Sequence, residues 1–323
     1  MQYNHIEIFL ITYMHPSTTE PLHTPVLLII FNRPHTTQQV FDRIREVKPK
    51  RLYVAADGPR PHVPTDNDRC AETRKIVEQV DWDCEVKTLF QEQNLRCGVA
   101  PATAISWLFE NEETGIILED DCVPSKSFFW FCQEVLEKYK HDTRIMHVSG
   151  NNYLNGWKRD NDYSYYFSDK VNAWGWATWR RAWQLFDFHI PTYKEIEQKG
   201  YLNGLFLNKF EEAYRLGQLK KTIANIEKGD VWDYQWEFTV YSNSGLCIIP
   251  EVNLVRNIGF GEDATHTFNL HDKNAFVKEN EISFPLRHPR FVIRDIESDK
   301  RNFNYLMKNK VSAKLKSIFS FSL

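Results

Sequence analysis

The sequence lacks the two glycine-rich loops that most often mark nucleotide-binding enzymes. It has no Gly-x-Gly-x-x-Gly fingerprint and no Walker-type Gly-Lys-Ser loop. A dinucleotide oxidoreductase and a P-loop nucleoside triphosphatase are therefore disfavoured. No Cys-x-x-Cys pair occurs among its 6 cysteines, so a structural zinc site is not expected.

Long apolar runs and a dominant charge are also missing. The early apolar run at residues 8–13 is far shorter than the roughly 20 residues that span a bilayer, and no basic leader precedes it. The formal net charge of -3 gives no reason to expect a nucleic-acid partner. We expect a cytoplasmic protein with reduced thiols. The basic and apolar tail at residues 308–323 leaves two readings open: peripheral association with the inner face of a membrane, or a self-packed terminal helix.

Aromatic residues are abundant, with 10 Trp, 14 Tyr and 22 Phe. A large aromatic core accounts for most of them, and flat carbohydrate-binding surfaces are a second source.

Short apolar runs alternate with helical patterns from residue 24 onward. The pattern predicts strands at residues 25–31, 51–56, 84–90 and 115–118, and helices at residues 36–47, 68–80, 101–111 and 128–139. Later helices are expected at residues 192–218 and 231–243, with a strand at residues 246–249. This alternation predicts an α/β fold with a twisted, mostly parallel sheet flanked by helices.

Each of the four early strands ends in polar residues. These are Asn32-Arg33, Asp57-Gly58, Gln91-Glu92 and Glu119-Asp120-Asp121. Ligands of open parallel sheets bind outside the carboxyl ends of the strands, so these residues are expected along one binding rim.

The acidic triplet Glu119-Asp120-Asp121 is the strongest candidate on this rim. Crowded carboxylates repel one another, and a hard cation such as Mn²⁺ or Mg²⁺ relieves the repulsion. Such a cation would neutralise a diphosphate leaving group. The alternative is that the three acids only favour the start of the next helix, which follows Pro124 and Ser125.

The ordered set of residues 26–33, Ala56-Asp57-Gly58 and residues 116–121 resembles the GT-A fold glycosyltransferases. The likeness is to bacterial nucleotide-diphospho-sugar transferases and to the β-1,2-N-acetylglucosaminyltransferase I group, and it runs from Thr24 to His266. It implies a Rossmann-like nucleotide-binding half with a smaller acceptor half. The expected organisation is an N-terminal extension at residues 1–23, the transferase domain at 24–270 and a C-terminal extension at 271–323. Within the domain, residues 24–148 would bind the donor and 149–270 the acceptor.

The resemblance also assigns roles around the donor. Arg33 and Asp57 would contact the nucleotide, and Asp121 would bind the metal directly. Asp120 would share the metal site, and with Glu119 it would reach the ribose or a metal-bound water. The loop at residues 257–267 would order over the donor, where His266 would add a metal or phosphate contact. Surface ion pairing for Arg33 and a simple Asp-Gly turn at Asp57 are the alternatives.

On the acceptor side, the resemblance points to Trp174, Gly175 and Trp176 as the floor of the acceptor site, with an aromatic core as the competing interpretation. Asp233 would be the general base, with Asp230 as the fallback. Asp233 could instead serve only in the first turn of a helix capped by Asp230.

We therefore predict a metal-dependent, inverting glycosyltransferase that moves a sugar from a nucleotide-diphosphate sugar, UDP-linked by resemblance, to a glycan or glycolipid. The alternatives are a sugar-phosphate nucleotidyltransferase and a catalytically inactive carbohydrate-binding protein of the same fold.

Overall fold

The computed structural model describes residues 22–154, 156–260 and 277–320; for residues 311–320 it describes only the backbone. Its centre is an eight-stranded sheet. The strands of the sheet follow the order β3-β2-β1-β4-β8-β6-β9-β7. Their bounds are β1 Val26–Ile30, β2 Arg51–Ala56, β3 Glu85–Phe90, β4 Thr114–Glu119, β6 Ile145–Ser149, β7 Tyr165–Ser168, β8 Trp176–Trp179 and β9 Leu246–Pro250. Two short strands, β5 Cys122–Pro124 and β10 Val255–Asn257, form a separate antiparallel pair.

The first half of the sheet is parallel and the second half is mixed. β1 pairs in parallel with β2 and β4, and β2 pairs in parallel with β3. β8 runs antiparallel between β4 and β6, β9 is parallel to β6, and β7 closes the edge antiparallel to β9. The predicted α/β fold class, with a largely parallel sheet between helices, is confirmed.

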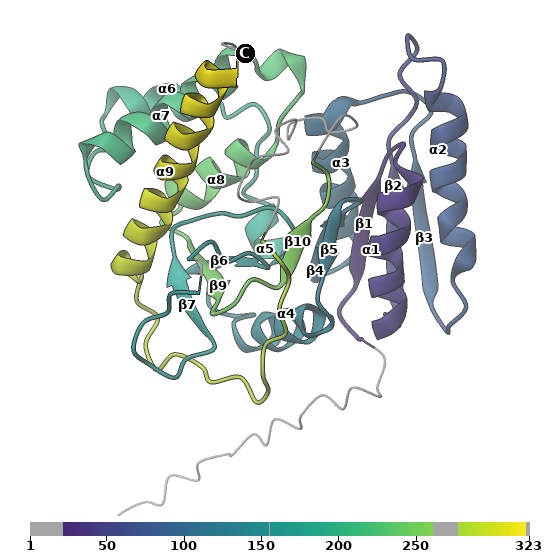
Figure 1. The fold of residues 1–323 in the computed structure, drawn as a ribbon, viewed down its shortest axis with the longest axis horizontal. Helices are drawn as coiled ribbons and strands as arrows, with labels where there is room; N and C mark the ends of the chain where they lie inside the picture. The colour runs from purple at the N-terminus through teal and green to yellow at the C-terminus, as the bar shows by residue number, and fades with distance from the viewer. Residues whose placement is uncertain (1–21, 155, 261–276, 321–323) are drawn as a thin grey trace, which may run out of the picture.

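The strand β1 is buried along its whole length, as its unbroken apolar sequence predicts. Because side chains alternate across a strand, Leu28 and Ile30 enter one core and Leu27 and Ile29 enter the other. Helices α1 (Pro34–Val47) and α4 (Lys126–Lys138) supply the first core, and α3 (Arg96–Asn111), α5 (Arg180–Trp183) and α8 (Asp233–Ser242) supply the second. Helices α1 and α2 (Asp66–Arg74) lie beside the parallel strands in Figure 1.

The predicted early strands and helices are confirmed in kind, with shifted ends. Helix α1 starts at Pro34 rather than at Thr36 or Thr37, because proline suits the first helical turn, where its missing N–H needs no partner. The helix predicted over residues 68–80 is α2 followed by the 3₁₀ turn η1 (Lys75–Gln79).

The single helix predicted over residues 192–218 is wrong. The chain forms α6 (Tyr193–Gln198), passes through Gly200 with φ +67°, and begins α7 (Lys209–Ala224) at a new cap. The side chain of Asn208 provides that cap by accepting from the N–H groups of Phe210 and Glu211. The helix predicted over residues 231–243 is present as α8, and the 3₁₀ turn η2 (Ile226–Lys228) precedes it.

The C-terminal helix α9 (Ile296–Ser320) lies alongside β7 and the α6–α7 region (Figure 1). Phe303 on α9 contacts the rings of Phe210 and Tyr214 on α7. The predicted N-terminal extension falls almost entirely on residues 1–21, outside the described residues. Within the described ranges, no helix combines the length and apolar character that crossing a bilayer requires.

Candidate functional site

The register of β1 and β4 brings Arg33 to the acidic triplet. The two strands are parallel neighbours with Ile29 opposite Glu119, so the residues that follow each strand meet at the same rim. Arg33 Nη1 lies 2.8 Å from Asp121 Oδ2, and Nη2 pairs with Asp120 Oδ1. The N–H of Phe31 donates to the other oxygen of Asp120 at 3.3 Å. The predicted nucleotide-contacting arginine is therefore an ion-pair partner of the predicted metal ligands.

Burial and crowding set the charge state of this cluster. Burial, followed by the charges of Asp121 and Asp120, raises the pKa of the Glu119 carboxyl to about 8. Burial also raises the pKa of Asp120, against the opposing charge of Arg33. Burial alone would lower the pKa of Arg33, but the two aspartates outweigh it and raise that pKa. One arginine thus compensates only part of the negative charge that three carboxylates bring together.

The strand β10 and the residues after it cover the ion pair. The N–H of Ile258 donates to the backbone oxygen of Asp121 at 2.8 Å, and Asn257 Nδ2 lies 3.5 Å from Asp121 Oδ1. A Cβ on Gly259 would stand 1.9 Å from Asp121 Oδ2. A side chain at this position would have to displace the Asp121 carboxylate or the loop. The sequence placed this loop near the donor but did not identify Asn257 and Gly259; the Asn-x-Gly spacing at the start of the loop is the one local signal for them. His266 lies outside the described residues.

Asp57 follows β2 and is buried, with both carboxylate oxygens already engaged. Oδ1 accepts from the N–H groups of Gly58 and Leu95, each at 2.8 Å, and Oδ2 accepts from Asn94 Nδ2 at 2.8 Å. Burial raises the pKa of Asp57 despite these donors. The observed task of Asp57 is to hold the loop that precedes α3, and its contact with a nucleotide stays a prediction.

The start of α3 fixes the segment that carries Asp230 and Asp233. The N–H of Gly98 donates to the oxygen of Gly229 at 2.8 Å, and Cys97 Sγ lies 3.1 Å from the oxygen of Asp230. Helix α8 then begins at Asp233, with Trp232 rather than Asp230 at its N-cap. The charge of Asp233 contributes to raising the pKa of Glu119, after the larger effects of burial and of its own neighbours. The predicted base therefore occupies the first turn of α8, and its charge reaches the Glu119 carboxyl of the acidic rim.

The predicted acceptor floor divides into two environments. Trp176 in β8 is 1% exposed and stacks on Trp232 at 5.5 Å, which is the core placement that the sequence left open. Trp174 is only partly buried and contacts the ring of Phe260 at 5.9 Å. Gly175 has φ +69°, and a Cβ there would lie 2.8 Å from Val255. In this structure Trp176 has no ring face left for a sugar, whereas Trp174 keeps part of its surface near the loop that covers Asp121.

A divalent cation at this rim would need ligands beyond the protein. Among the residues the structure describes, no group of three or more His, Cys, Asp and Glu side chains could hold a metal. Asp120 and Asp121 do offer the hard oxygen ligands that Mg²⁺ and Mn²⁺ prefer, and Mg²⁺ commonly uses one or two carboxylates together with substrate phosphates. The side chains fit a cation that arrives with a diphosphate rather than a preformed metal centre.

No family model and no curated protein matches the sequence. Solved structures with a similar fold include two transferases and one synthase by title. An inositol-1-phosphate CTP transferase from T. maritima shares 8% identity, with coverage of 77% of this chain and 93% of that one and a TM-score of 0.37. A 4-diphosphocytidyl-2C-methyl-D-erythritol synthase from Anaerococcus prevotii shares 12% identity, covering 59% and 82%, at a TM-score of 0.30.

The third, mouse xyloside xylosyltransferase 1 in its apo form, shares 8% identity, with coverage of 68% of this chain and 81% of that one and a TM-score of 0.31. Likenesses at these scores carry no argument about activity, so the functional case depends on the site itself.

Proposed function

We propose that the chain is an inverting glycosyltransferase that uses a divalent cation and a nucleotide-diphosphate sugar, with UDP as the expected nucleotide. The observation that carries the proposal is the arrangement of Arg33, Asp120 and Asp121 at the carboxyl ends of β1 and β4, with the candidate base Asp233 close enough for its charge to affect the Glu119 carboxyl. This combination supports a leaving-group side and a proton-accepting side within one site.

On the leaving-group side, Asp120 and Asp121 would hold the cation, and Arg33 would bind phosphate oxygens. Bound there, Mn²⁺ or Mg²⁺ would neutralise the charge of the departing diphosphate. Arg33 already lies between the two aspartates, so its guanidinium is positioned at the point where negative charge would increase. The loop around Gly259 would exclude water from these groups.

On the acceptor side, Asp233 would accept the proton of the attacking hydroxyl. Direct attack on the anomeric carbon, opposite the diphosphate, inverts the configuration of the sugar. Asp230, three residues earlier and exposed, is the second candidate for this proton.

A thermal-shift panel of nucleoside diphosphates, with and without Mn²⁺, tests the proposal. We expect one diphosphate to raise the unfolding midpoint only when Mn²⁺ is present, because ligand binding to the folded state stabilises it. Asp121→Asn should remove this shift. Asp142→Asn is the matched control, since Asp142 pairs with Arg144 on the surface. A wild-type protein that responds to no diphosphate under either condition would refute the proposal.

Turnover assays separate the proposal from its alternatives. A glycosyltransferase should slowly hydrolyse one nucleotide sugar to the free diphosphate, and NMR of the transfer product should show the inverted anomer. Release of pyrophosphate from a nucleoside triphosphate would instead indicate nucleotidyl transfer. Glycan binding without any turnover would indicate an inactive binding protein.

A further inference from the structure

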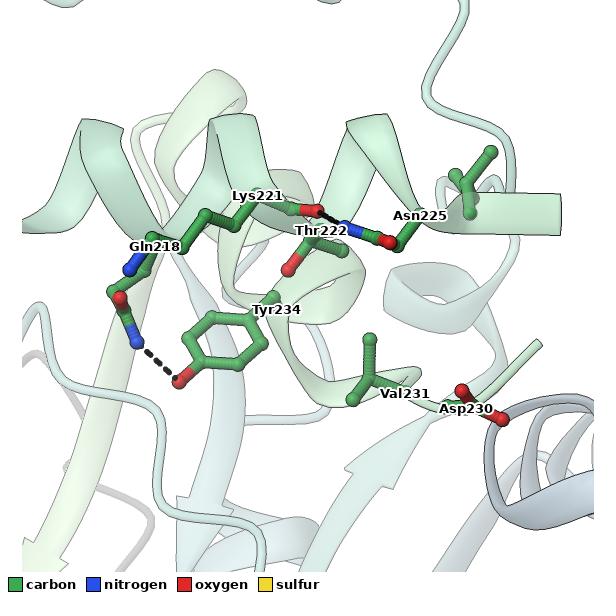
Figure 2. Close-up of a pocket in the computed structure, with 8 residues that line it drawn as sticks. Gln218, Lys221, Thr222, Asn225, Asp230, Val231 and Tyr234 are labelled. Atoms are coloured by element: carbon green, nitrogen blue, oxygen red, sulfur yellow. Dashed lines mark hydrogen bonds between the residues drawn. The ribbon is translucent and has the colours of Figure 1, made fainter. Parts of the chain in front are cut away.

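A small pocket lies beside the segment that carries the candidate base. Its volume is about 180 Å³, and its lining comes from α7, η2 and the start of α8. The lining residues are Gln218, Lys221, Thr222, Asn225, Ile226, Asp230, Val231 and Tyr234. Figure 2 shows Tyr234 and Val231 on one side and the residues of α7 on the other. Drug-sized ligands occupy roughly 300 Å³ or more, so this pocket suits a single small ring.

The chemistry of the lining fits a sugar. Gln218 Nε2 donates to Tyr234 Oη at 3.1 Å, which fixes an amide and a hydroxyl at one end of the pocket. Asp230 lies at the other end, beyond Val231 (Figure 2). Val231, Ile226 and the tyrosine ring supply apolar surface between these polar ends. Polar ends around an apolar middle match a ring that carries hydroxyls at its edge and C–H groups on its face.

The charges of the lining favour a neutral ligand over a phosphate. Lys221 is the only cationic lining residue, and the carboxylate of Asp230 balances it. A phosphate would meet that carboxylate as a like charge, whereas hydroxyl groups can donate to it and accept from the lysine.

The pocket adjoins the segment that carries both candidate bases. Asp230 lines it directly, and Asp233 stands in the chain between the lining residues Val231 and Tyr234, at the start of α8. A ring held in the pocket would therefore lie beside Asp230 and next to the first turn of α8.

We propose that this pocket between α7 and α8 binds one neutral sugar ring of the acceptor and presents a hydroxyl of that ring to the segment that carries the candidate bases Asp230 and Asp233. The inference rests on the proposed function and adds an acceptor subsite that is separate from Trp174 and Trp176.

Saturation-transfer NMR with the methyl β-glycosides of glucose, galactose and N-acetylglucosamine tests the pocket. At least one glycoside should bind the wild-type protein. Gln218→Ala and Tyr234→Phe each remove one hydrogen-bonding group from the pocket. Each substitution should raise the Kd of the bound glycoside about fivefold, which corresponds to a loss of about 1 kcal/mol of binding free energy. Lys220→Ala is the control, because Lys220 lies on α7 but pairs with Glu197 and does not line the pocket.

Two outcomes would refute the proposal that the pocket binds an acceptor sugar. The first is that none of the three glycosides binds, and the second is that a glycoside binds with a Kd that both pocket substitutions leave unchanged. The nucleoside diphosphate shift, measured on the same wild-type preparation, separates this failure from failure of the proposed function. If the diphosphate shift is present and glycoside binding is absent, only the pocket is refuted. If the diphosphate shift and turnover are both absent, the proposed function itself is refuted.

Discussion

Arg33 Nη1 lies 2.8 Å from Asp121 Oδ2, so the carboxylate expected to hold a cation is already paired with an arginine. The same guanidinium contacts Asp120. Arginine and a divalent cation would therefore compete for the same oxygens. Under the proposed function, a bound diphosphate would resolve the competition, because its oxygens would take over the pairing with Arg33.

Arg33→Met should increase the response of the protein to Mn²⁺. Without Arg33, two largely buried carboxylates lack their cation, and we expect the metal-free protein to lose about 3 kcal/mol or more of stability. Mn²⁺ should restore part of that loss, so its effect on the unfolding midpoint should be larger in the variant than in the wild type. Arg60→Met, which breaks the more exposed pair with Asp66, should destabilise without any added response. An equal or smaller Mn²⁺ response in Arg33→Met would contradict the shared-oxygen model.

Gly259→Ala should disturb the acidic rim, because its Cβ would stand 1.9 Å from Asp121 Oδ2 and 2.9 Å from Arg33 Nη1. Either the loop or the ion pair must move, at a cost of about 1–3 kcal/mol. Thermal unfolding should show the loss, and titration with a nucleoside diphosphate and Mn²⁺ should show weaker binding. Gly217→Ala is the matched control. A Cβ there meets nothing within 4 Å in α7, so it should stabilise by about 0.5–1 kcal/mol.

The parallel half of the fold could be predicted because its signals are local. The apolar run of β1 is followed by polar Asn32, and β2 is followed by the Asp57-Gly58 turn, so the local sequence marks where each strand ends. The rule that ligands gather at carboxyl ends then placed Arg33, Asp57 and Glu119 on one rim. The further finding that Arg33 pairs with the triplet depends on β1 lying beside β4, which no local pattern encodes.

The second half of the sheet was less predictable, because its strands are not neighbours in the order in which they follow along the chain. β8 inserts antiparallel between β4 and β6, and this insertion buries Trp176 among Trp183, Trp232 and Trp236. A tryptophan-rich segment fits a sugar-binding surface and a core equally well until its neighbours are known. The pocket beside Asp230 likewise depends on the packing of the C-terminal half of α7 against the start of α8, which no local pattern encodes.

Lys170→Met should be strongly destabilising, because Lys170 is buried between two carboxylates. Its Nζ lies 2.6 Å from Glu211 and 2.9 Å from Asp169, and all three side chains are at most 6% exposed. Removing the lysine leaves Glu211 and Asp169 short of positive charge, and we expect a loss of about 3 kcal/mol in urea denaturation with an unchanged m-value. Lys199→Met removes the exposed pair with Glu195 on α6 and should change stability by about 0.5 kcal/mol or less. Similar losses in the two variants would show that burial does not amplify the Lys170 interaction.

His147 should make the fold sensitive to acid. Its ring stacks on Trp176, its Nε2 lies 3.0 Å from the carbonyl oxygen of Asn172, and its Nδ1 accepts from Trp236 Nε1 at 3.2 Å. Burial lowers the pKa of His147 from 6.5 to about 3, so the folded state resists a proton that the unfolded state accepts. The contribution of His147 to the free energy of unfolding is therefore fully present above about pH 6.5. It declines as the pH falls toward 3, by at most about 1.4 kcal/mol per pH unit.

Urea denaturation of the wild type and of His147→Asn between pH 7 and pH 4.5 measures this effect. The variant should be less stable at pH 7, because it loses the ring stacking and the bond from Trp236. Its stability should nevertheless fall less steeply with acid, because the unfolded state no longer gains a proton at this position. The difference between the two slopes isolates His147 from the carboxylates, which titrate in both proteins. Parallel curves would mean that the buried imidazole does not couple protonation to unfolding.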